Sequence, residues 1–241
     1  TLTSGSWVGT ATVEATVDTI TATVEVKFRP EDPYTLILTA TPDHIVVGGG
    51  TSSIEAAVTD EYGNWVKNGT VVSFVTSGGW IVPSTATTAD GRAYSVLTSD
   101  TVAQTVTVTA TADIAVGTVQ VVFVPGEPRV TIVADPIVLS TGETSAIAVT
   151  AMDAWGNPVI DGTTVWLTTT LGVFVPDGFT TTTRTTLAGE VFTAVRSEQV
   201  GTALVRATVG SDSAAVVITF EPGIPAHISL TVDPVEIVGC G

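Results

Sequence analysis

The chain resembles itself at a period of about 95 residues, and this internal repeat limits what it can fold into. Three segments share the frame Phe-x-Pro-x-x-Pro, beginning at Phe28, Phe123 and Phe220, which lie 95 and 97 residues apart. Proline fixes φ and has no N–H to donate to a sheet, so each frame ends a strand and forms a short, stiff connector. We therefore expect several units in tandem.

Before each frame lie two segments in which apolar and polar residues alternate. In the first copy the apolar positions run from Ala11 to Val17 and from Val24 to Phe28, with threonine and charged residues between them. The pattern recurs at residues 106–123 and 203–220. Alternation of period two puts one face of a strand in the core and the other in water, which is typical of antiparallel sandwiches. After each frame we expect an opening strand, and these strands end at three prolines: Pro42, Pro136 and Pro234.

The middle of the unit occurs twice and is marked by turns. Residues 60–64 and 153–157 both read Asp-x-aromatic-Gly-Asn. Aspartate accepts local backbone hydrogen bonds, whereas glycine and asparagine tolerate positive φ, so both segments are predicted to be turns with solvated acids. Further turns introduce the other strands of the unit. We expect these strands to bury Val72 and Phe74 or Val165 and Leu167, and later to contain Tyr94 and Val96 or Phe192 and Ala194.

Composition agrees with strands throughout. Threonine and valine supply 45 and 40 of the 241 residues, and β-branched residues favour pleated surfaces over helices. The predicted fold class is all-β, with tandem immunoglobulin-like antiparallel β-sandwiches arranged as a rod. The predicted domains are closing strands of an incomplete domain at 1–30, complete domains at 31–125 and 126–222, and the opening strand of a further domain at 223–241. We therefore expect the chain to be a segment of a longer array of such repeats.

These motifs, in this order, resemble bacterial immunoglobulin-like domain repeats of the invasin and intimin type. The resemblance is carried by the opening strands ending in Asp135-Pro136 and Asp233-Pro234, the turn at 153–159, the stretch Asp90-Gly91-Arg92-Ala93 and closing strands such as 106–110. Trp65 stands where that family usually has proline, and Thr41 precedes the first of these prolines in place of aspartate. The resemblance implies a rigid extracellular rod in adhesins of bacterial surfaces or in other secreted proteins.

Charge and residue usage exclude several functions. The 8 basic residues face 24 acidic ones, for a net charge of −16, and no cluster of cations is present for a phosphate backbone, so we expect no nucleic acid partner. No apolar run reaches the roughly 20 residues that span a bilayer. Cys240 is the only cysteine and His44 and His227 are the only histidines. Because the paired acids sit in turns and no Gly-x-Ser-x-Gly elbow occurs, we predict no enzymatic activity.

Tryptophans are the candidate interaction residues. Trp7, Trp65 and Trp155 sit at turns, and Trp166 occupies an outward position that Ser73 takes in the previous unit. Exposed aromatic side chains at domain ends can anchor interfaces. The alternative is that these rings pack against a neighbouring domain or fold back on their own sandwich.

Two further sites are considered. Calcium takes oxygen ligands, and four acids flank the junctions: Glu31, Asp32, Glu127 and Glu221. No EF-hand or RTX-type spacing accompanies them, so we expect solvated acids and no cofactor, with calcium as the minor alternative. Asn68-Gly69-Thr70 matches an N-glycosylation sequon, and outward threonine hydroxyls are potential O-glycan acceptors. The asparagine also serves a turn, which explains it without a glycan.

Two functions remain open from the sequence. The first is a structural module, a stiff extracellular stalk or filament whose partners are neighbouring immunoglobulin-like domains or other copies of the same array. The second is an adhesin segment that binds a host or glycan surface through turn aromatics such as Trp65 and Trp155. Both place the chain outside the cell or on its surface.

Overall fold

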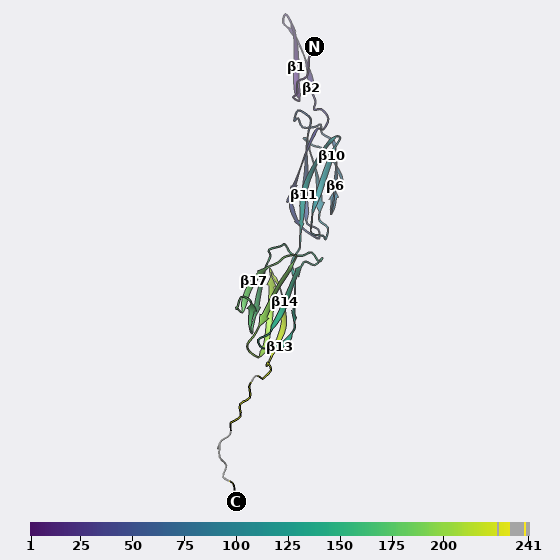
Figure 1. Cartoon of the computed structure of the whole chain (residues 1–241). Coiled ribbons are helices and arrows are strands. Elements are labelled where there is room, and N and C mark those ends of the chain that lie inside the picture. The colour runs from purple at the N-terminus through teal and green to yellow at the C-terminus, as the bar shows by residue number, and fades with distance from the viewer. Residues whose placement is uncertain (226, 232–238, 240–241) are drawn as a thin grey trace. The chain divides into compact units, whose positions relative to one another are not determined.

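A computed structural model describes residues 1–225, 227–231 and 239 (Figure 1). The described chain consists of strands joined by turns and short loops. The prediction of an opening strand within residues 223–241 falls largely outside the described residues, as does Cys240. Among the described residues, no helix is long and apolar enough to cross a membrane.

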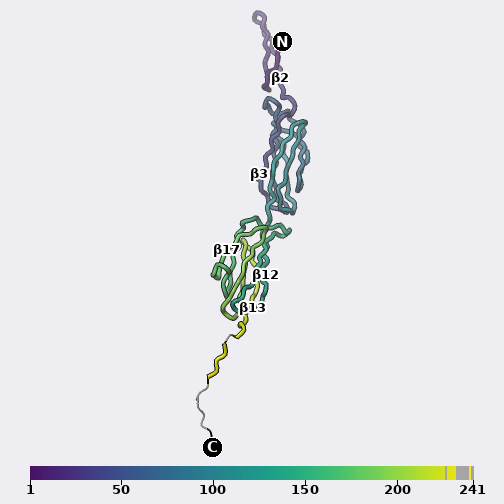
Figure 2. The backbone as a smooth tube through the Cα atoms, in the orientation of Figure 1, coloured from purple at the N-terminus to yellow at the C-terminus, as the bar shows by residue number. Residues whose placement is uncertain are grey.

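The first complete sandwich has two sheets that face each other (Figure 2). One sheet has the order β3-β5-β9-β7 and the other the order β4-β11-β10-β6-β8. The bounds are β3 (Thr35–Thr41), β4 (His44–Val46), β5 (Thr51–Thr59), β6 (Val71–Thr76), β7 (Trp80–Val82), β8 (Thr85–Thr87), β9 (Arg92–Thr98), β10 (Gln104–Ala112) and β11 (Ala115–Val124).

The second sandwich repeats this topology strand for strand. Its sheets have the orders β12-β14-β18-β16 and β13-β20-β19-β15-β17. The bounds are β12 (Arg129–Asp135), β13 (Val138–Ser140), β14 (Thr144–Met152), β15 (Thr164–Thr169), β16 (Val173–Val175), β17 (Thr181–Thr185), β18 (Glu190–Arg196), β19 (Gly201–Val209) and β20 (Asp212–Glu221).

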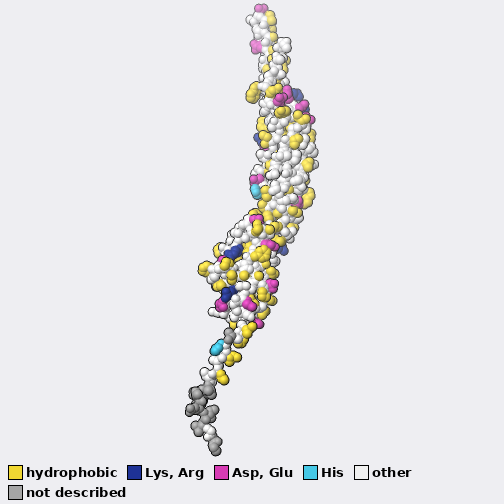
Figure 3. All heavy atoms as spheres, in the orientation of Figure 1, with side chains coloured by type: hydrophobic (Ala, Val, Ile, Leu, Met, Phe, Trp, Pro, Cys, Tyr) yellow, Lys and Arg dark blue, Asp and Glu magenta, His cyan; other side chains and the backbone are white. Residues whose placement is uncertain are grey.

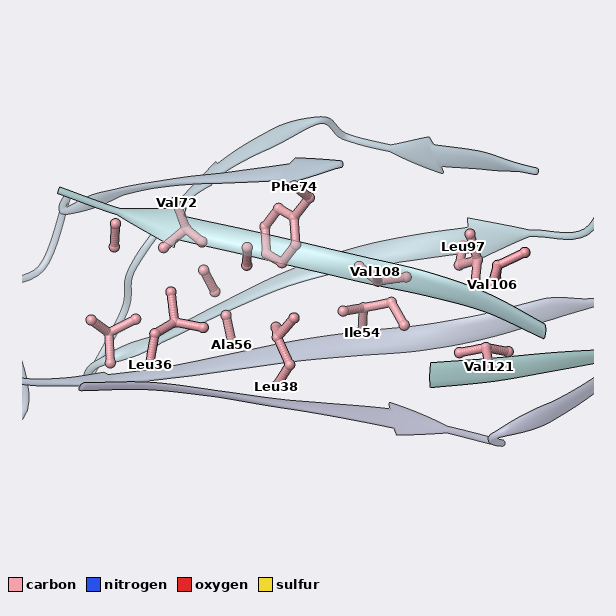
Figure 4. Packing of buried hydrophobic residues seen from close by; sticks show 14 of the residues in the cluster. Leu36, Leu38, Ile54, Ala56, Val72, Phe74, Leu97, Val106, Val108 and Val121 are labelled. Atoms are coloured by element: carbon pink, nitrogen blue, oxygen red, sulfur yellow. The ribbon is translucent and has the colours of Figure 1, made fainter. Parts of the chain in front are cut away.

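The core of the first sandwich lies between its two sheets (Figure 4). Ile54 and Leu97 from one sheet meet Phe74 and Val108 from the other, and all four side chains are buried. Complete burial of such a side chain stabilises the fold by about 1.5–3 kcal/mol. The predicted burial of Val72, Phe74, Val165 and Leu167 is confirmed. The strands predicted around Tyr94 and Phe192 also form, but these two rings point outward, and their neighbours Ala93 and Val191 face the core.

The sandwiches are not purely antiparallel, which the alternation pattern did not predict. β4 pairs with β11 in parallel, with His44 opposite Val122, and β13 pairs with β20 in the same way. Pro42 and Pro136 cause this change, because a proline cannot donate to the ladder that it would have continued. The chain leaves one sheet at the proline and joins the edge of the other sheet two residues later.

The first two strands, β1 (Gly9–Val17) and β2 (Ile20–Phe28), form a hairpin with the register of β10–β11 and β19–β20. Gly9 faces Phe28 as Gln104 faces Phe123. The expectation that this hairpin buries one face is wrong for the described chain. Val13 is 39% exposed, whereas Val108 at the matching position is fully buried. Among the described residues, β1 and β2 form a two-stranded sheet of their own, and its apolar face is not covered by a second sheet.

The described chain divides into two compact units. Unit 1 comprises Thr1–Glu127 together with the turn Asp153–Asn157, and unit 2 comprises Pro128–Met152 and the residues from Pro158 onward. Each unit has its own cluster of buried apolar side chains. The predicted domain boundaries at 30, 125 and 222 stay a prediction, because compactness alone does not define where a repeat unit begins.

Candidate functional site

Asp60 is a buried acid in a turn, and its carboxylate is surrounded by donors. The residue is 2% exposed. Its Oδ1 accepts hydrogen bonds from the backbone N–H groups of Tyr62, at 3.0 Å, and Asn64, at 2.8 Å. Its Oδ2 accepts from the backbone N–H of Glu31 at 3.1 Å. Two of these bonds shape the turn, and the third holds the connector that precedes β3.

Asn64 extends this arrangement toward the start of the N-terminal hairpin. Its Nδ2 donates to Asp60 Oδ2 at 3.0 Å and to the backbone carbonyl of Ser6 at 2.8 Å. Its Oδ1 accepts from the backbone N–H of Val8 at 3.4 Å. We call this set the first clamp: the side chains of Asp60 and Asn64 with the backbone groups of Ser6, Val8 and Glu31.

The second clamp repeats the first with the same atoms. Asp153 Oδ1 accepts from the N–H groups of Trp155 and Asn157, each at 2.9 Å, and its Oδ2 accepts from Gly126 N–H at 3.0 Å. Asn157 Nδ2 donates to Asp153 Oδ2 and to the carbonyl of Thr101, each at 2.8 Å. Asn157 Oδ1 accepts from Ala103 N–H at 2.9 Å. All these residues belong to unit 1. The recurrence of each donor and acceptor shows that the clamp is part of the repeat.

The clamp carboxylates are held in the charged form. Burial is the largest single influence on the pKa of Asp60 and of Asp153, and it raises the value. The hydrogen bonds from the partner asparagine and from backbone N–H groups outweigh it, so the pKa of both acids lies below the ordinary value. Such bonds stabilise a carboxylate because they replace the water removed by burial.

An aromatic ring accompanies each clamp at the second position after its aspartate. At the second clamp the indole of Trp155 covers Gly48, and a Cβ added to Gly48 would overlap the ring. The same ring lies against Gly126. At the first clamp Tyr62 lines a hollow of about 350 Å³, together with Trp7, Asp60 and Asn64. The Trp155 ring therefore packs on Gly48 and Gly126, whereas the Tyr62 ring lines an open hollow.

The other predicted tryptophans have different surroundings. Trp65 packs on its own sandwich, with its ring against Gly91 and the Arg92 guanidinium 5.1 Å from the ring centroid. Trp166 is 63% exposed on β15, between Thr183 and Thr208 of the adjacent strands. Trp7 is 78% exposed. The role of the four tryptophans in interaction stays a prediction.

Asn68, the predicted glycosylation residue, has a structural contact. Its Oδ1 accepts a hydrogen bond from Asp90 N–H at 2.7 Å. In the second sandwich Asp161 takes this place and accepts from Ala188 N–H at 2.6 Å. An aspartate cannot carry an N-glycan, so the turn explains the residue in both copies. Glycosylation of Asn68 stays a prediction.

The predicted junction acids do not gather. Within the described ranges, no group of three or more His, Cys, Asp or Glu side chains lies close enough to hold a metal ion. Glu31 contributes its backbone N–H to the first clamp, and its side chain is not part of it. The acids buried beside the connectors are Asp60 and Asp153, whose oxygens already accept several hydrogen bonds. Calcium binding stays a prediction without a site among these residues.

The clamp asparagines were missed as functional residues by sequence reasoning, and the clamp acids were misread as solvated. The sequence does contain a signal for the clamp asparagines. A turn of this kind needs its aspartate and its glycine, but the asparagine also recurs at the same position in both turns. The recurrence of Asn64 and Asn157 indicates a contact beyond the turn.

Comparison with solved structures identifies the class of fold. The adhesin FdeC of Escherichia coli matches with a TM-score of 0.56 and 16% identity, over 90% of this chain and 75% of that chain. InvD of Yersinia pseudotuberculosis matches with a TM-score of 0.52 and 21% identity, over 81% of this chain and 60% of that chain. The adhesin InvE of Yersinia pseudotuberculosis matches at a TM-score of 0.40 and 20% identity, over 78% of this chain, and this chain spans 60% of it.

No protein-family model matches the chain, and a search of curated proteins found no match. The structural matches extend over most of the chain. The chain has the tandem immunoglobulin-like fold that it shares with FdeC and InvD, and the prediction of tandem all-β sandwiches is confirmed.

Proposed function

We propose that the chain is a non-enzymatic structural repeat module of a bacterial surface or secreted protein, a segment of a stiff extracellular stalk or filament. The observation that supports this function is the repeated clamp. Residues 153–157 join β14 to β15, and this turn belongs to the same compact unit as its clamp partners Thr101, Ala103 and Gly126. In this proposal the role of the clamp is to limit bending where one repeat follows another.

The energetics of the clamp favour a structural role. Each carboxylate accepts three backbone N–H bonds, and leaving a buried donor or acceptor unsatisfied costs about 1–3 kcal/mol. Charge-assisted bonds of this kind are about twice as strong as neutral ones. A turn held at several points has little freedom to rotate, which is a property useful to a stalk.

The surface suits an extracellular stalk. Most of the face seen in Figure 3 is neither charged nor hydrophobic side chain. Exposed threonine contributes to the surface on β17, where Thr181, Thr183 and Thr185 point outward. Hydroxyl groups keep such a surface hydrated without the side-chain entropy of long charged residues, and they offer places for O-glycans. Neighbouring immunoglobulin-like domains are the proposed partners.

The stiffness can be measured as a distance distribution. Spin labels at Ser73→Cys and Thr183→Cys, two exposed positions on β6 and β17, in a Cys240→Ser background would report on the two sandwiches by pulsed electron resonance. We expect a narrow distribution that broadens in Asn157→Ala. The matched control, Phe192→Thr, removes an exposed ring on β18, a strand of the sheet that does not contain β17, and should leave the distribution narrow. Equal widths in all three chains would refute the proposal of a clamped stalk.

A second function, an adhesin segment that binds a host or glycan surface, is favoured by the exposure of Trp7, Trp155 and Trp166. The two functions differ in which substitution matters. Surface binding should be lost in Trp155→Ala or Trp166→Thr and kept in Asn64→Ala, whereas a stalk loses stiffness only in the clamp variants. Binding to glycan arrays and to cell-surface proteins measures the first effect directly.

A further inference from the structure

The two clamps hold backbone groups at fixed positions relative to a closing hairpin, and we call each such set a socket. The carbonyl acceptor lies three residues before the hairpin ladder starts, and one N–H donor lies one residue before it. A second N–H donor lies three residues after the closing phenylalanine. For β10–β11, whose ladder joins Gln104 to Phe123, these residues are Thr101, Ala103 and Gly126. For β1–β2 they are Ser6, Val8 and Glu31.

The second sandwich has the same set at the end of its own closing hairpin. The ladder of β19–β20 joins Gly201 to Phe220, so the corresponding groups are the carbonyl of Glu198 and the N–H groups of Val200 and Gly223. In the part of the chain that the structure describes, no hydrogen bond engages these three groups.

The surroundings of this third set are built like those of the second. Gly142 N–H donates to the carbonyl of Ser197 at 2.8 Å, as Gly48 N–H donates to that of Asp100 at 2.6 Å. Thr141 N–H donates to Glu221 at 2.9 Å, as Val47 N–H donates to Val124 at 2.9 Å. Gly142 therefore occupies the position at which Gly48 receives the Trp155 ring.

The surface above the third set is open. A Cβ at Gly142 would meet only Glu198 Oε2, at 3.7 Å, and one at Gly223 only Thr141 Oγ1, at 3.8 Å. The matching positions Gly48 and Gly126 lie under Trp155. A hollow of about 370 Å³, lined partly by Arg196 and Glu198, adjoins the set.

We infer that Glu198, Val200 and Gly223 form a third socket, which takes the Asp-x-aromatic-Gly-Asn turn of a further immunoglobulin-like sandwich. The aspartate of that turn accepts from Gly223 N–H. Its asparagine accepts from Val200 N–H and donates to the Glu198 carbonyl. Its aromatic ring covers Gly142 and displaces the exposed Glu198 side chain, which pairs with Arg196. The inference rests on the proposed function, because it assumes that the clamp joins repeats.

The test supplies the turn that the socket should hold. Replacing residues 223–241 by a copy of residues 126–241 duplicates the second sandwich and keeps the Pro-Gly connector. Residue-resolved amide hydrogen exchange then compares Val200 with Ala103, the matching donor of the second clamp. We expect exchange at Val200, and at the connector glycine after Pro222, to slow by about tenfold. Asn157→Ala in the added copy alone should restore fast exchange at Val200.

A stability measurement supports the exchange data. Gly142→Ala in the first copy should lower the melting temperature of the duplicated chain more than the same substitution lowers that of the original chain. Only in the duplicated chain is an aromatic ring expected over this glycine. Calorimetry of the duplicated chain shows whether the added copy folds.

The outcomes separate the two proposals. Slow exchange at Ala103 with unchanged fast exchange at Val200, beside a folded added copy, overturns the third socket and leaves the clamped stalk intact. Fast exchange at both Ala103 and Val200, with no response to Asn157→Ala in either copy, overturns the clamp itself and with it the proposed function.

Discussion

The hairpins β1–β2 and β10–β11 have the same ladder and opposite surroundings. Both pair nine residues to nine in the same register, and both meet a clamp just before the first strand. The sheet β3-β5-β9-β7 buries one face of β10–β11, and the corresponding face of β1–β2 is exposed. Alternation in the sequence therefore fixes the register of a hairpin, whereas burial depends on a second sheet that the hairpin does not encode.

This comparison separates two kinds of stabilisation within one repeat. Core packing differs between the two hairpins, and the clamp is the same at both. Substitutions at matching positions can therefore measure each contribution alone, provided that the matched pairs do not touch one another.

Phe123→Ala should produce the largest effect, and its matched control is Phe28→Ala. Phe123 is buried in the core of the first sandwich, and Phe28 is only partly buried. Truncation of a buried phenylalanine costs about 3–5 kcal/mol. We expect a loss of that size at Phe123 and one below about 1 kcal/mol at Phe28, where little packing is removed. Urea unfolding and, separately, calorimetry measure the loss in unfolding free energy for both variants. Equal losses would mean that β1–β2 is covered in solution.

Asp153→Ala and Asp60→Ala should produce the next largest effects, and the two should be similar. Each substitution leaves the backbone donors of its clamp without their acceptor, which costs about 1–3 kcal/mol. Asp161→Ala, at an exposed turn where one N–H is engaged, serves as the control and should cost less. A large effect at Asp153 with none at Asp60 would show that the first clamp does not form.

Gly48→Ala should destabilise the chain by about 1 kcal/mol more than Gly142→Ala, a cost within the range for overpacking. Both glycines have a φ near +85°, at +81° and +86°, so both variants carry the same backbone strain. Only Gly48 lies under a ring, and a methyl group there must displace Trp155. Thermal unfolding of both variants isolates the packing of that ring. Identical melting temperatures would place Trp155 away from Gly48.

Much of the fold was predictable from the sequence because its signals are local. Alternation located the hairpins, and the turns at 68–69 and 161–162 located the strands that follow them. The parallel strand β4 escaped prediction because three residues are too few to show a period. The clamp escaped because its contacts are distant: Asn64 and Ser6 are 58 residues apart, and Asp60 and Glu31 are 29 apart. No local pattern reveals that a turn aspartate is buried among donors from elsewhere in the chain.

Acid should produce the smallest effect, one that is absent at neutral pH. Burial raises the pKa of Asp153, but the hydrogen bonds from Gly126, Trp155 and Asn157 together lower it by more. The pKa in the folded chain therefore lies below the unfolded value of about 3.9. A lowered pKa adds stability that is complete above the unfolded value and is lost as the pH falls through the folded value. The gap in unfolding free energy between the parent chain and Asp153→Ala should therefore be constant from pH 7 to about pH 4 and shrink below it. Urea midpoints of both chains at pH 6, 4 and 3 give this gap, and the other acids cancel in the difference. A gap that stays constant down to pH 3, or that widens, would contradict a clamp held by the charge of the carboxylate.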